Sequence, residues 1–248
     1  MSAGGLRAVE ASPVADTGEG REPVRLSVVV PAYREGAALG ASLRRIRDEA
    51  AGWGFGHEVI ASVHTGQGAT LAAARDVARE WPMLRVLEVP VVRGKGAAVR
   101  LGVLASHGEI VVFTDADLSV PAAALGVLPA WFDARPTVSV GIGSRVHPES
   151  RVPRAQGRLR RLTARGFNRW VRMLTGLPWR DTQCGFKAFR RESAMKLFEP
   201  LESGHFAFDV ELLVRARQLG VHVEEMPVEW TQGPGTSVSV PRDVLAMG

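Results

Sequence analysis

The sequence predicts a single α/β domain, in which a mostly parallel central sheet carries helices on both faces. The first observation is an alternation: from Val24 onward, short runs rich in β-branched residues alternate with longer segments of helix-like composition. The second is composition, since hydrophobic residues make up 46% of the chain and charged residues 23%, as is typical of a protein that folds around a core. The third is length: 248 residues suit one large domain or two small ones, and the chain has no internal repeat and no clear linker.

Five runs in the first part of the chain are strand candidates, because each is short, apolar and rich in β-branched or aromatic residues. In chain order they are Leu26–Pro31, Glu58–Val63, Arg85–Val89, Ile110–Thr114 and Val138–Gly143. Between them lie four segments of helix-like composition: Ala37–Ala50, Ala69–Glu80, Lys95–Ser106 and Pro121–Asp133. Because strands that are joined through helices run parallel, this alternation predicts a parallel sheet.

The second part of the chain is less regular. A long helix is expected over Gln156–Leu174, with a break at Gly176 and Pro178. The pattern then predicts a strand, two short helices and a last strand: Cys184–Phe189, Glu192–Phe198, Asp209–Leu219 and His222–Trp230. Residues 1–23 are rich in Gly, Ala, Ser and Glu without periodicity, so we expect a disordered tail there and a domain over residues 24–248.

Composition excludes several classes of protein. The longest apolar runs, such as Leu26–Ala32, are far too short to span a bilayer, and the first 25 residues lack the apolar stretch of a secretory signal. The single cysteine, Cys184, cannot form an internal disulfide. One cysteine is also too few for a zinc finger or a cysteine-rich module. We therefore expect a cytoplasmic protein, either free or peripheral to a membrane.

Polar residues gather where the predicted strands end, and open parallel sheets bind their ligands at that edge. The stretch Val28–Glu35, VVVPAYRE, is a buried strand that runs into Pro31 and is followed by Tyr33 and Glu35. An ordinary strand exit is the alternative interpretation, and the motif alone is only moderately specific.

A Gly-rich helix start follows at Arg93–Val103, RGKGAAVRLGV, where Gly94 and Gly96 flank Lys95. Free backbone N–H groups, the helix dipole and one ammonium group together favour an anion. The spacing differs from that of a P-loop. A turn with a solvated Lys is the alternative interpretation.

Two carboxylates follow the apolar strand EIVVF in the motif Phe113–Ser119, FTDADLS. Asp115 and Asp117 repel each other unless a cation or a proton intervenes. A divalent cation with open positions for diphosphate oxygens would resolve that repulsion. The alternative is an Asp-rich turn that caps the helix near Pro121.

In this order, the motifs resemble those of the family-2 glycosyltransferases, which have the Rossmann-like GT-A fold. The resemblance is closest to the branch of dolichyl-phosphate glucosyltransferases and polyprenyl-phosphate sugar transferases. It covers roughly Leu26 to Asp243, and RDTQCGFK with FAFDVELL is its most specific part. The matching stretches are VVVPAYRE, RGKGAAVRLGV, TDADLS, GSRV, RDTQCGFKAFRRE, FAFDVELL and VEEMPVEW.

The resemblance implies roles for individual residues. A donor site would include Pro31, Ala32, Tyr33, Glu35, Lys95, Asp115, Ala116 and Asp117. Asp117 would ligate Mg²⁺ or Mn²⁺, and Ser119 stands where some relatives use a Gln ligand. Arg145 and Lys187 would bind the acceptor, with Arg145 facing an acceptor phosphate. An Arg fork suits an anionic acceptor, and a metal suits a departing diphosphate.

This chain departs from the family pattern in three places. Relatives end the second strand with an acidic signature that contacts the base, whereas Val63–Gly68 reads VHTGQG. Either His64 or Gln67 substitutes for that acid, or the base differs. Gly235–Val238 has no Lys where relatives often carry one near the diphosphate, and the chain shows no membrane anchor.

Asp181 is the candidate catalytic residue, and its role depends on the acceptor. If the acceptor is a hydroxyl, this carboxylate would take its proton as a general base. If the acceptor is a phosphate, or if the residue only ties its loop together, Asp181 positions other groups. Cys184 lacks an evident His partner, and Asp209 and Glu211 suit a helix start better than a place in the acceptor pocket.

The expected helix Gln156–Leu174 carries a stripe of basic residues at steps of three or four, with apolar residues opposite. The stripe consists of Arg158, Arg161, Arg165, Arg169 and Arg172. The net charge is +5, and three of the 31 basic residues are Lys. Codon bias explains most of the Arg count but not its placement. We expect an anionic partner for the stripe, as in peripheral membrane contact, and no nucleic acid; a solvated helix face is the alternative.

The sequence therefore predicts a metal-dependent, inverting glycosyltransferase that moves a hexose from a nucleoside diphosphate sugar, UDP-glucose-like, to a polyprenyl phosphate. One alternative is a soluble transferase that acts on a small hydrophilic or natural-product acceptor. Another is a relative that binds nucleotide sugars without catalysis.

Overall fold

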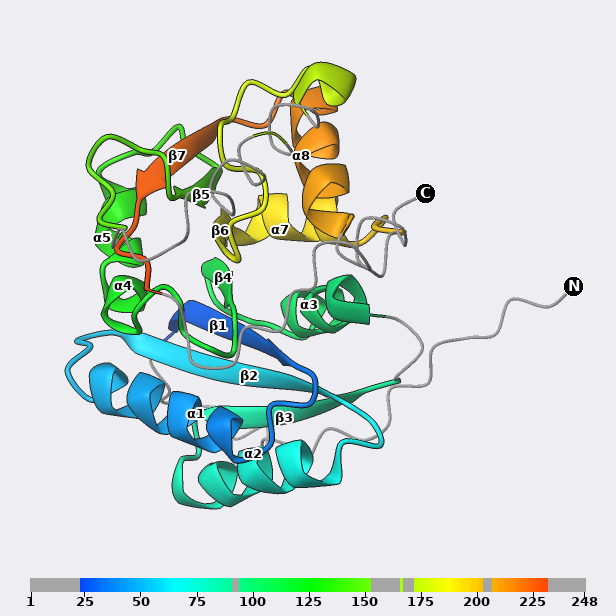
Figure 1. The fold of residues 1–248 in the computed structure, drawn as a ribbon. Helices are drawn as coiled ribbons and strands as arrows, with labels where there is room; N and C mark the ends of the chain where they lie inside the picture. Colours follow the sequence, from blue (N-terminus) through cyan, green and yellow to red (C-terminus); the bar gives the residue numbers. More distant parts are fainter. Residues whose placement is uncertain (1–22, 91–93, 153–165, 167–171, 203–206, 232–248) are drawn as a thin grey trace, which may run out of the picture.

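A computed structural model describes residues 23–90, 94–152, 166, 172–202 and 207–231 of the chain. They form a seven-stranded sheet in the order β3-β2-β1-β4-β6-β5-β7 (Figure 1). The strands are β1 Val24–Ala32, β2 Gly56–His64, β3 Leu84–Val89, β4 Ile110–Thr114, β5 Val140–Ser144, β6 Phe186–Arg190 and β7 Val223–Pro227. Only β6 runs antiparallel to its two neighbours, β4 and β5. The expectation of a mostly parallel sheet is confirmed.

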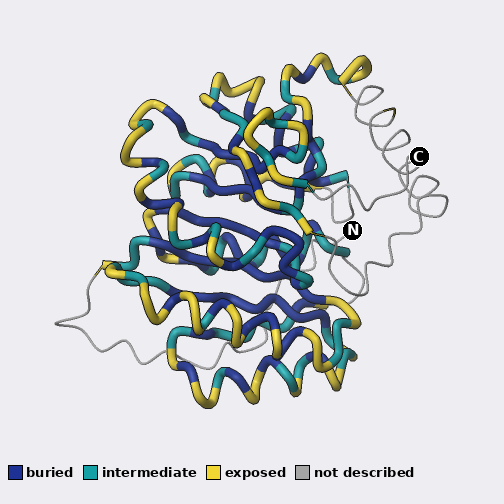
Figure 2. The backbone as a smooth tube through the Cα atoms, turned by 60° about the vertical axis from the view of Figure 1, so that its left-hand side comes forward, coloured by how far each residue is buried: buried dark blue, intermediate teal, exposed yellow. Residues whose placement is uncertain are grey.

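Helices cover both faces of this sheet, as expected. One face packs against α1 Ala37–Ala50, α2 Gly68–Glu80, α4 Ala123–Gly126 and α5 Leu128–Asp133. The other packs against α3 Gly94–Leu104, α7 Arg191–Phe198 and α8 Phe208–Gln218. Figure 2 shows the result: the strands are buried along most of their length, and exposed residues lie on the outer sides of the helices.

The continuous apolar runs of the strands follow from this double cover, because both faces of each strand meet a hydrophobic layer. In β1, Val28 and Val30 join the core cluster under α1 and α2, whereas Val29 joins the cluster under α3. Helix α3 lies especially close to the sheet. A Cβ atom on Gly102 would lie 2.6 Å from the Ser62 hydroxyl and would also collide with Val29.

The structure corrects one predicted helix. The segment Pro121–Asp133 forms two short helices, α4 and α5, that meet at Val127. Pro129 lies in the first turn of α5, where its missing N–H costs nothing. Within one continuous helix its ring would clash with the carbonyl group of Leu125. The other described elements differ from the predictions mainly at their ends; β7, for example, stops at Pro227.

The reversed strand β6 decides what the ligand-binding edge contains. Because β6 runs antiparallel to β4, Phe186 at its start lies opposite Thr114 at the end of β4. The loop that precedes β6 therefore meets the residues that follow β4, which include Asp115. The end of β6, Arg190, lies instead at the opposite edge of the sheet, beside Ile110.

The predicted disordered tail and most of the long basic helix lie outside the described residues. At the described end of that helix, Arg172, Met173 and Leu174 are helical and exposed, Leu174 at 66%. This residue belongs to the apolar side of the predicted stripe, and it does not enter the core. No helix among the described residues is both long enough and apolar enough to cross a membrane.

Candidate functional site

A strained turn after β4 presents the two predicted carboxylates. The Leu118 N–H donates to the Asp115 carbonyl over 3.0 Å, and Leu118 takes a positive φ of 48°, which is rare for a residue with a side chain. The backbone N–H and the hydroxyl of Ser119 both donate to the Asp117 carboxylate, at 3.0 and 2.8 Å. Backbone strain of this kind occurs mostly at functional sites, and here it fixes the direction of both carboxylates.

Asp115 pairs with Lys95, whose ammonium lies 2.6 Å from its Oδ1. Lys95 lies in the first turn of α3, so the free N–H groups of that turn face the same region. Burial opposes the charge of Lys95, but attraction by Asp115, Asp209 and Asp117 outweighs burial and raises its pKa. The helix start and the carboxylates thus form one charged cluster, as the sequence predicted.

Gly185, in the loop before β6, packs directly against the Asp115 carboxylate. A Cβ atom at Gly185 would overlap both oxygens of that carboxylate. The glycine is therefore required by close approach, and its backbone forms the wall behind Asp115. Sequence reasoning missed this role because the contact depends on the reversal of β6.

Glu35 joins the two Asp residues from the exit of β1. Arg34 and Gly36 on either side have positive φ angles, and the Gly36 N–H donates to the Thr70 hydroxyl over 2.9 Å. This turn directs Glu35 toward the cluster. Partial burial, and then repulsion by Asp117 and Asp115, raises the pKa of Glu35. An excess of negative charge therefore exists on this side of the cluster.

These residues fit a divalent cation. Carboxylate and hydroxyl oxygens are the ligands that Mg²⁺ and Mn²⁺ prefer, and a cation would relieve the repulsion that acts on Glu35. Within the part of the chain that the structure describes, no three His, Cys, Asp or Glu side chains converge as a complete metal cage. A cation held by Asp117 and its neighbours would need further oxygen ligands besides these side chains.

The residues predicted for the nucleoside line the adjacent ends of β1 and β2. Pro31 and Ala32 are buried, and Tyr33 is 45% exposed. The Tyr33 ring meets the His64 ring edge to face at 5.5 Å. Burial lowers the pKa of His64, and no described residue is hydrogen-bonded to its Nδ1 atom. Ala116, between the two carboxylates, is buried.

Arg145 and Asp181 form a tight buried clamp on the other side of Asp115. The Arg145 Nε and Nη2 atoms donate to the two Asp181 oxygens at 2.7 and 2.8 Å, and the Arg145 backbone N–H adds a third bond of 2.9 Å. The backbone N–H groups of Arg180 and Asp181 donate to Glu225 on β7. Burial alone would raise the pKa of Asp181, but Arg145 outweighs it and lowers that pKa.

This geometry helps to decide whether Asp181 is a general base or a residue that positions other groups. A carboxylate with a lowered pKa and both oxygens engaged is a poor proton acceptor, so the arrangement favours positioning over base catalysis. The Arg145 side chain itself remains 31% exposed, and its bonds to Asp181 use the Nε, Nη2 and backbone nitrogen atoms. The third guanidinium nitrogen, Nη1, takes no part in these bonds to Asp181.

The prediction that Lys187 contacts the acceptor directly does not fit its position. Lys187 lies on β6 with no exposed surface, and its ammonium donates to Asp209 on α8 and to the Cys184 carbonyl. Its charge is satisfied inside the protein, behind the site. Cys184 is also buried, and burial raises the pKa of its thiol to about 12, which excludes a reactive thiolate.

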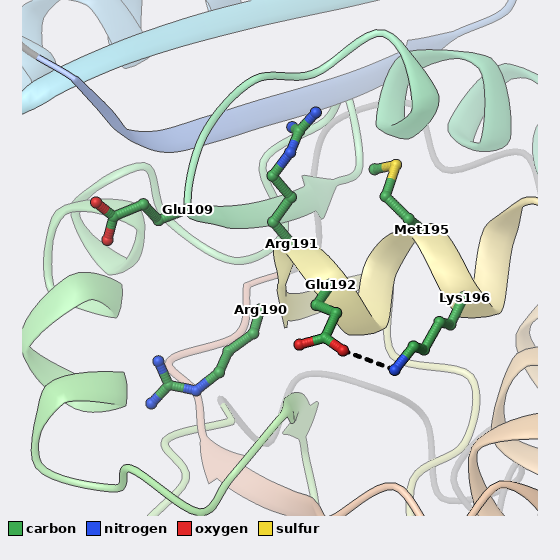
Figure 3. Close-up of a pocket in the computed structure, with 6 residues that line it drawn as sticks. All are labelled: Glu109, Arg190, Arg191, Glu192, Met195 and Lys196. Atoms are coloured by element: carbon green, nitrogen blue, oxygen red, sulfur yellow. Dashed lines mark hydrogen bonds and ion pairs between the residues drawn. The ribbon is translucent and has the colours of Figure 1, made fainter.

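A separate hollow of about 600 Å³ lies elsewhere on the surface (Figure 3). It is lined by Glu109, Arg190, Arg191, Glu192, Met195 and Lys196. These residues lie around the start of β4 and the end of β6, at the edge of the sheet opposite Asp115. The hollow is therefore not part of the candidate site.

Comparison with known proteins gives the chain its relatives. The model of Glycosyl transferase family 2 matches residues 27–198. A dolichyl-phosphate beta-glucosyltransferase from Drosophila melanogaster is 35% identical over 240 residues, which cover 91% of this chain and 72% of that protein.

Two solved structures share the fold. A mannosyltransferase from Pyrobaculum calidifontis in complex with GDP-Man and Mn²⁺ has a TM-score of 0.60 at 24% identity, over 88% of this chain and 59% of that one. A glucosyl-3-phosphoglycerate synthase from Mycobacterium tuberculosis, in complex with Mn²⁺, UDP-glucose and phosphoglyceric acid, has a TM-score of 0.62 at 23% identity, over 90% of this chain and 78% of that one.

Proposed function

Since the chain belongs to glycosyl transferase family 2 and is a glycosyltransferase with the GT-A fold, we propose that it transfers a hexose from a nucleoside diphosphate sugar to a polyprenyl phosphate. The relative from Drosophila supports this acceptor, because it is a dolichyl-phosphate beta-glucosyltransferase by name and the alignment covers 91% of this chain. UDP-glucose is the first donor to test.

The donor would bind at the ends of β1, β2 and β4. The exposed ring of Tyr33 offers a contact for the nucleoside, and Lys95 with the first turn of α3 offers positive charge for the diphosphate. Asp117, supported by Ser119, would hold Mg²⁺ or Mn²⁺. When bound, the cation neutralises charge on the departing diphosphate.

The acceptor phosphate would contact Arg145. The two hydrogen bonds that hold the Arg145 guanidinium on Asp181 are the observation that carries the proposal. Arg145 is held by the buried Asp181 carboxylate while 31% of its side chain stays exposed, and the negative charge of Asp115 also acts on it. A guanidinium fixed in this way suits a phosphate, because a planar guanidinium can donate two parallel hydrogen bonds to two phosphate oxygens.

The chemistry then requires no base. An oxygen of the acceptor phosphate attacks the anomeric carbon, and the bond from that carbon to the diphosphate oxygen breaks with its electron pair on the nucleoside diphosphate. One in-line displacement inverts the anomeric centre. Because a phosphate monoester keeps at least one unprotonated oxygen at neutral pH, Asp181 can stay ionised and hold Arg145, as its lowered pKa favours.

Transfer of glucose from UDP-glucose to dolichyl phosphate, measured with Mn²⁺ by product chromatography, tests this proposal. We expect a glucosyl phospholipid whose formation stops in excess EDTA and in Asp117→Ala. Asp76→Ala, on the exposed side of α2, is the control. Transfer to hydroxyl acceptors alone would instead support the small-molecule alternative, and no turnover by the folded wild-type protein with any donor would support a non-catalytic binding protein.

A further inference from the structure

Lys187 and Asp209 form an ion pair in the interior, directly behind the candidate site. The Lys187 ammonium lies 2.5 Å from the Asp209 carboxylate and 2.7 Å from the Cys184 carbonyl, and it lies 5.5 Å from the centre of the Phe113 ring. Neither side chain is more than 4% exposed. The surroundings are aromatic, since Phe189 and Phe208 also pack around Phe113.

Such a buried ion pair adds little to the stability of the fold. Removing two charges from water costs several kcal/mol, and apolar residues of similar volume in the same place are often as stable or more stable. The aromatic cluster around Phe113 suits apolar side chains of similar volume, and replacing Lys187 with one would cost the hydrogen bond to the Cys184 carbonyl. The position of the pair, rather than its contribution to folding, therefore requires an explanation.

On the donor side, the pair supports Asp115. Lys187 holds the carbonyl of Cys184, and the next residue, Gly185, forms the wall against which the Asp115 carboxylate packs. Asp209 also attracts Lys95, the partner of Asp115. A shift of the Cys184–Gly185 backbone would move the Asp115–Lys95 pair with it.

On the acceptor side, the same loop carries Asp181. Two residues separate Asp181 from Cys184, whose carbonyl Lys187 holds, and the charge of Lys187 helps keep Asp181 ionised. Asp181 in turn fixes the Arg145 guanidinium. One buried ammonium thus tethers the short loop whose two ends contact the two halves of the site.

We propose that Lys187 and Asp209 are positioning residues that hold the donor-side pair Asp115–Lys95 and the acceptor-side pair Asp181–Arg145 at a fixed distance from each other. This inference rests on the proposed function, because the two halves matter together only if a donor and an anionic acceptor meet between them. Lys187 thereby affects the reaction without contacting either substrate.

The test compares three proteins in the glucose transfer assay, using UDP-glucose, Mn²⁺ and dolichyl phosphate. The double variant Lys187→Met/Asp209→Leu removes both charges and keeps the volume filled. Glu58→Gln is the control, because Glu58 is another buried carboxylate with several hydrogen bonds but lies near the start of β2, at the opposite edge. Thermal unfolding of each protein reports whether it is folded at the assay temperature.

We expect kcat of the double variant to fall roughly 100-fold, since a misplacement of about 1 Å has that effect. Both KM values should stay within about threefold, because each half still binds its own substrate. Glu58→Gln should lose thermal stability and keep its kcat. A purely structural role would not produce this split between kcat and KM.

Wild-type kcat in the folded double variant would overturn the inference, and so would equal losses of kcat in the double variant and in Glu58→Gln. If the double variant does not fold, Asp209→Asn carries the test. It keeps an oxygen acceptor for Lys187 but weakens the tether, so kcat should fall about tenfold at unchanged KM, and an unchanged kcat would overturn the inference. No transfer by the wild-type protein would overturn the proposed function and, with it, this role.

Discussion

At the scale of single residues, the positive charge of Arg145 compensates the negative charge of the buried Asp181 carboxylate. Arg145→Met would leave the Asp181 carboxylate in the interior without its partner, which typically costs 3–5 kcal/mol, roughly, of unfolding free energy. Arg145→Lys keeps the charge but loses the two-pronged geometry. We expect kcat/KM for dolichyl phosphate to fall about 30-fold or more in Arg145→Lys, since truncating one partner of a buried charged pair costs at least about 2 kcal/mol.

Steady-state kinetics at varied dolichyl phosphate and varied UDP-glucose would check this. The KM for UDP-glucose should hardly change, because Arg145 lies on the acceptor side. Arg79→Lys, on the exposed side of α2, is the control for loss of an arginine in general. A larger effect on the donor KM than on the acceptor KM would contradict the assignment of Arg145.

The lowered pKa of Asp181 gives a pH dependence with a definite sign. A carboxyl group whose folded-state pKa lies below its unfolded value stabilises the fold above the unfolded pKa, and this contribution is lost as the pH falls through the folded pKa. The wild-type protein should therefore lose stability below about pH 4. In Asp181→Asn/Arg145→Met the midpoint of thermal unfolding should fall less steeply between about pH 5 and pH 3, and an equal slope in both proteins would contradict the ion pair.

Glu35 gives the opposite effect, because burial and two neighbouring carboxylates raise its pKa. In metal-free protein at neutral pH, its negative charge works against folding. Glu35→Gln should therefore raise the unfolding midpoint without metal, by up to about 1 kcal/mol in free energy, since charge repulsion at a half-exposed site is screened. Differential scanning fluorimetry in EDTA checks this. A lower midpoint in Glu35→Gln would show that the three carboxylates do not repel one another.

The sequence predicted much of the site at this scale, because residues after strand ends must share one edge of a parallel sheet. Asp115, Lys95, Asp117 and Glu35 are found together for that reason. The burial of Lys187 was not predicted, since a Lys in a specific motif resembles a ligand-binding residue and its ion-pair partner, Asp209, lies on α8, 22 residues later in the chain. Gly185 carries no signal in the sequence beyond being a glycine.

At the scale of elements, helix α3 must lie close to the sheet for Lys95 to reach Asp115. Gly102 permits this approach to Val29 and Ser62. Gly102→Ala should destabilise the protein by about 1–3 kcal/mol and move the start of α3 away from Asp115. We expect a lower unfolding midpoint together with weaker binding of UDP in the presence of Mn²⁺, measured by calorimetry.

Gly54→Ala is the matched control, because a Cβ atom there would meet nothing within 4 Å. If Gly102→Ala bound UDP as the wild-type protein does, the spacing between α3 and the sheet would not determine the site.

The existence of α3 was predicted from sequence, but its distance from the sheet was not. Elements in the first part of the chain were predicted well because their periodicity is regular. The split of Pro121–Asp133 required attention to the position of Pro129.

At the scale of the whole molecule, the basic stripe remains a prediction, because of its five residues only Arg172 lies within the described part of the chain. Replacing Arg158, Arg161, Arg165 and Arg169 with Gln should reduce sedimentation with phosphatidylglycerol vesicles and leave catalysis on a detergent-dispersed acceptor unchanged. Each Arg near an anionic surface contributes about 1 kcal/mol to such binding. The control replaces Arg44, Arg45, Arg75 and Arg79 on α1 and α2. Equal binding by both variants, or no binding by the wild-type protein, would favour a solvated helix face.

The proposed activity depends on the carboxylates after β4 holding a divalent cation together with the diphosphate of the donor. Isothermal titration calorimetry of the metal-free protein with UDP, with and without Mn²⁺, tests this most directly. The same titrations are made with Asp117→Ala and with the control Asp76→Ala. We predict binding that requires Mn²⁺ and that weakens at least about 100-fold in Asp117→Ala, because even residues that only support a metal ligand contribute 10–100-fold to affinity. UDP that bound equally well without the cation, or equally well to Asp117→Ala, would contradict a metal-bridged donor site.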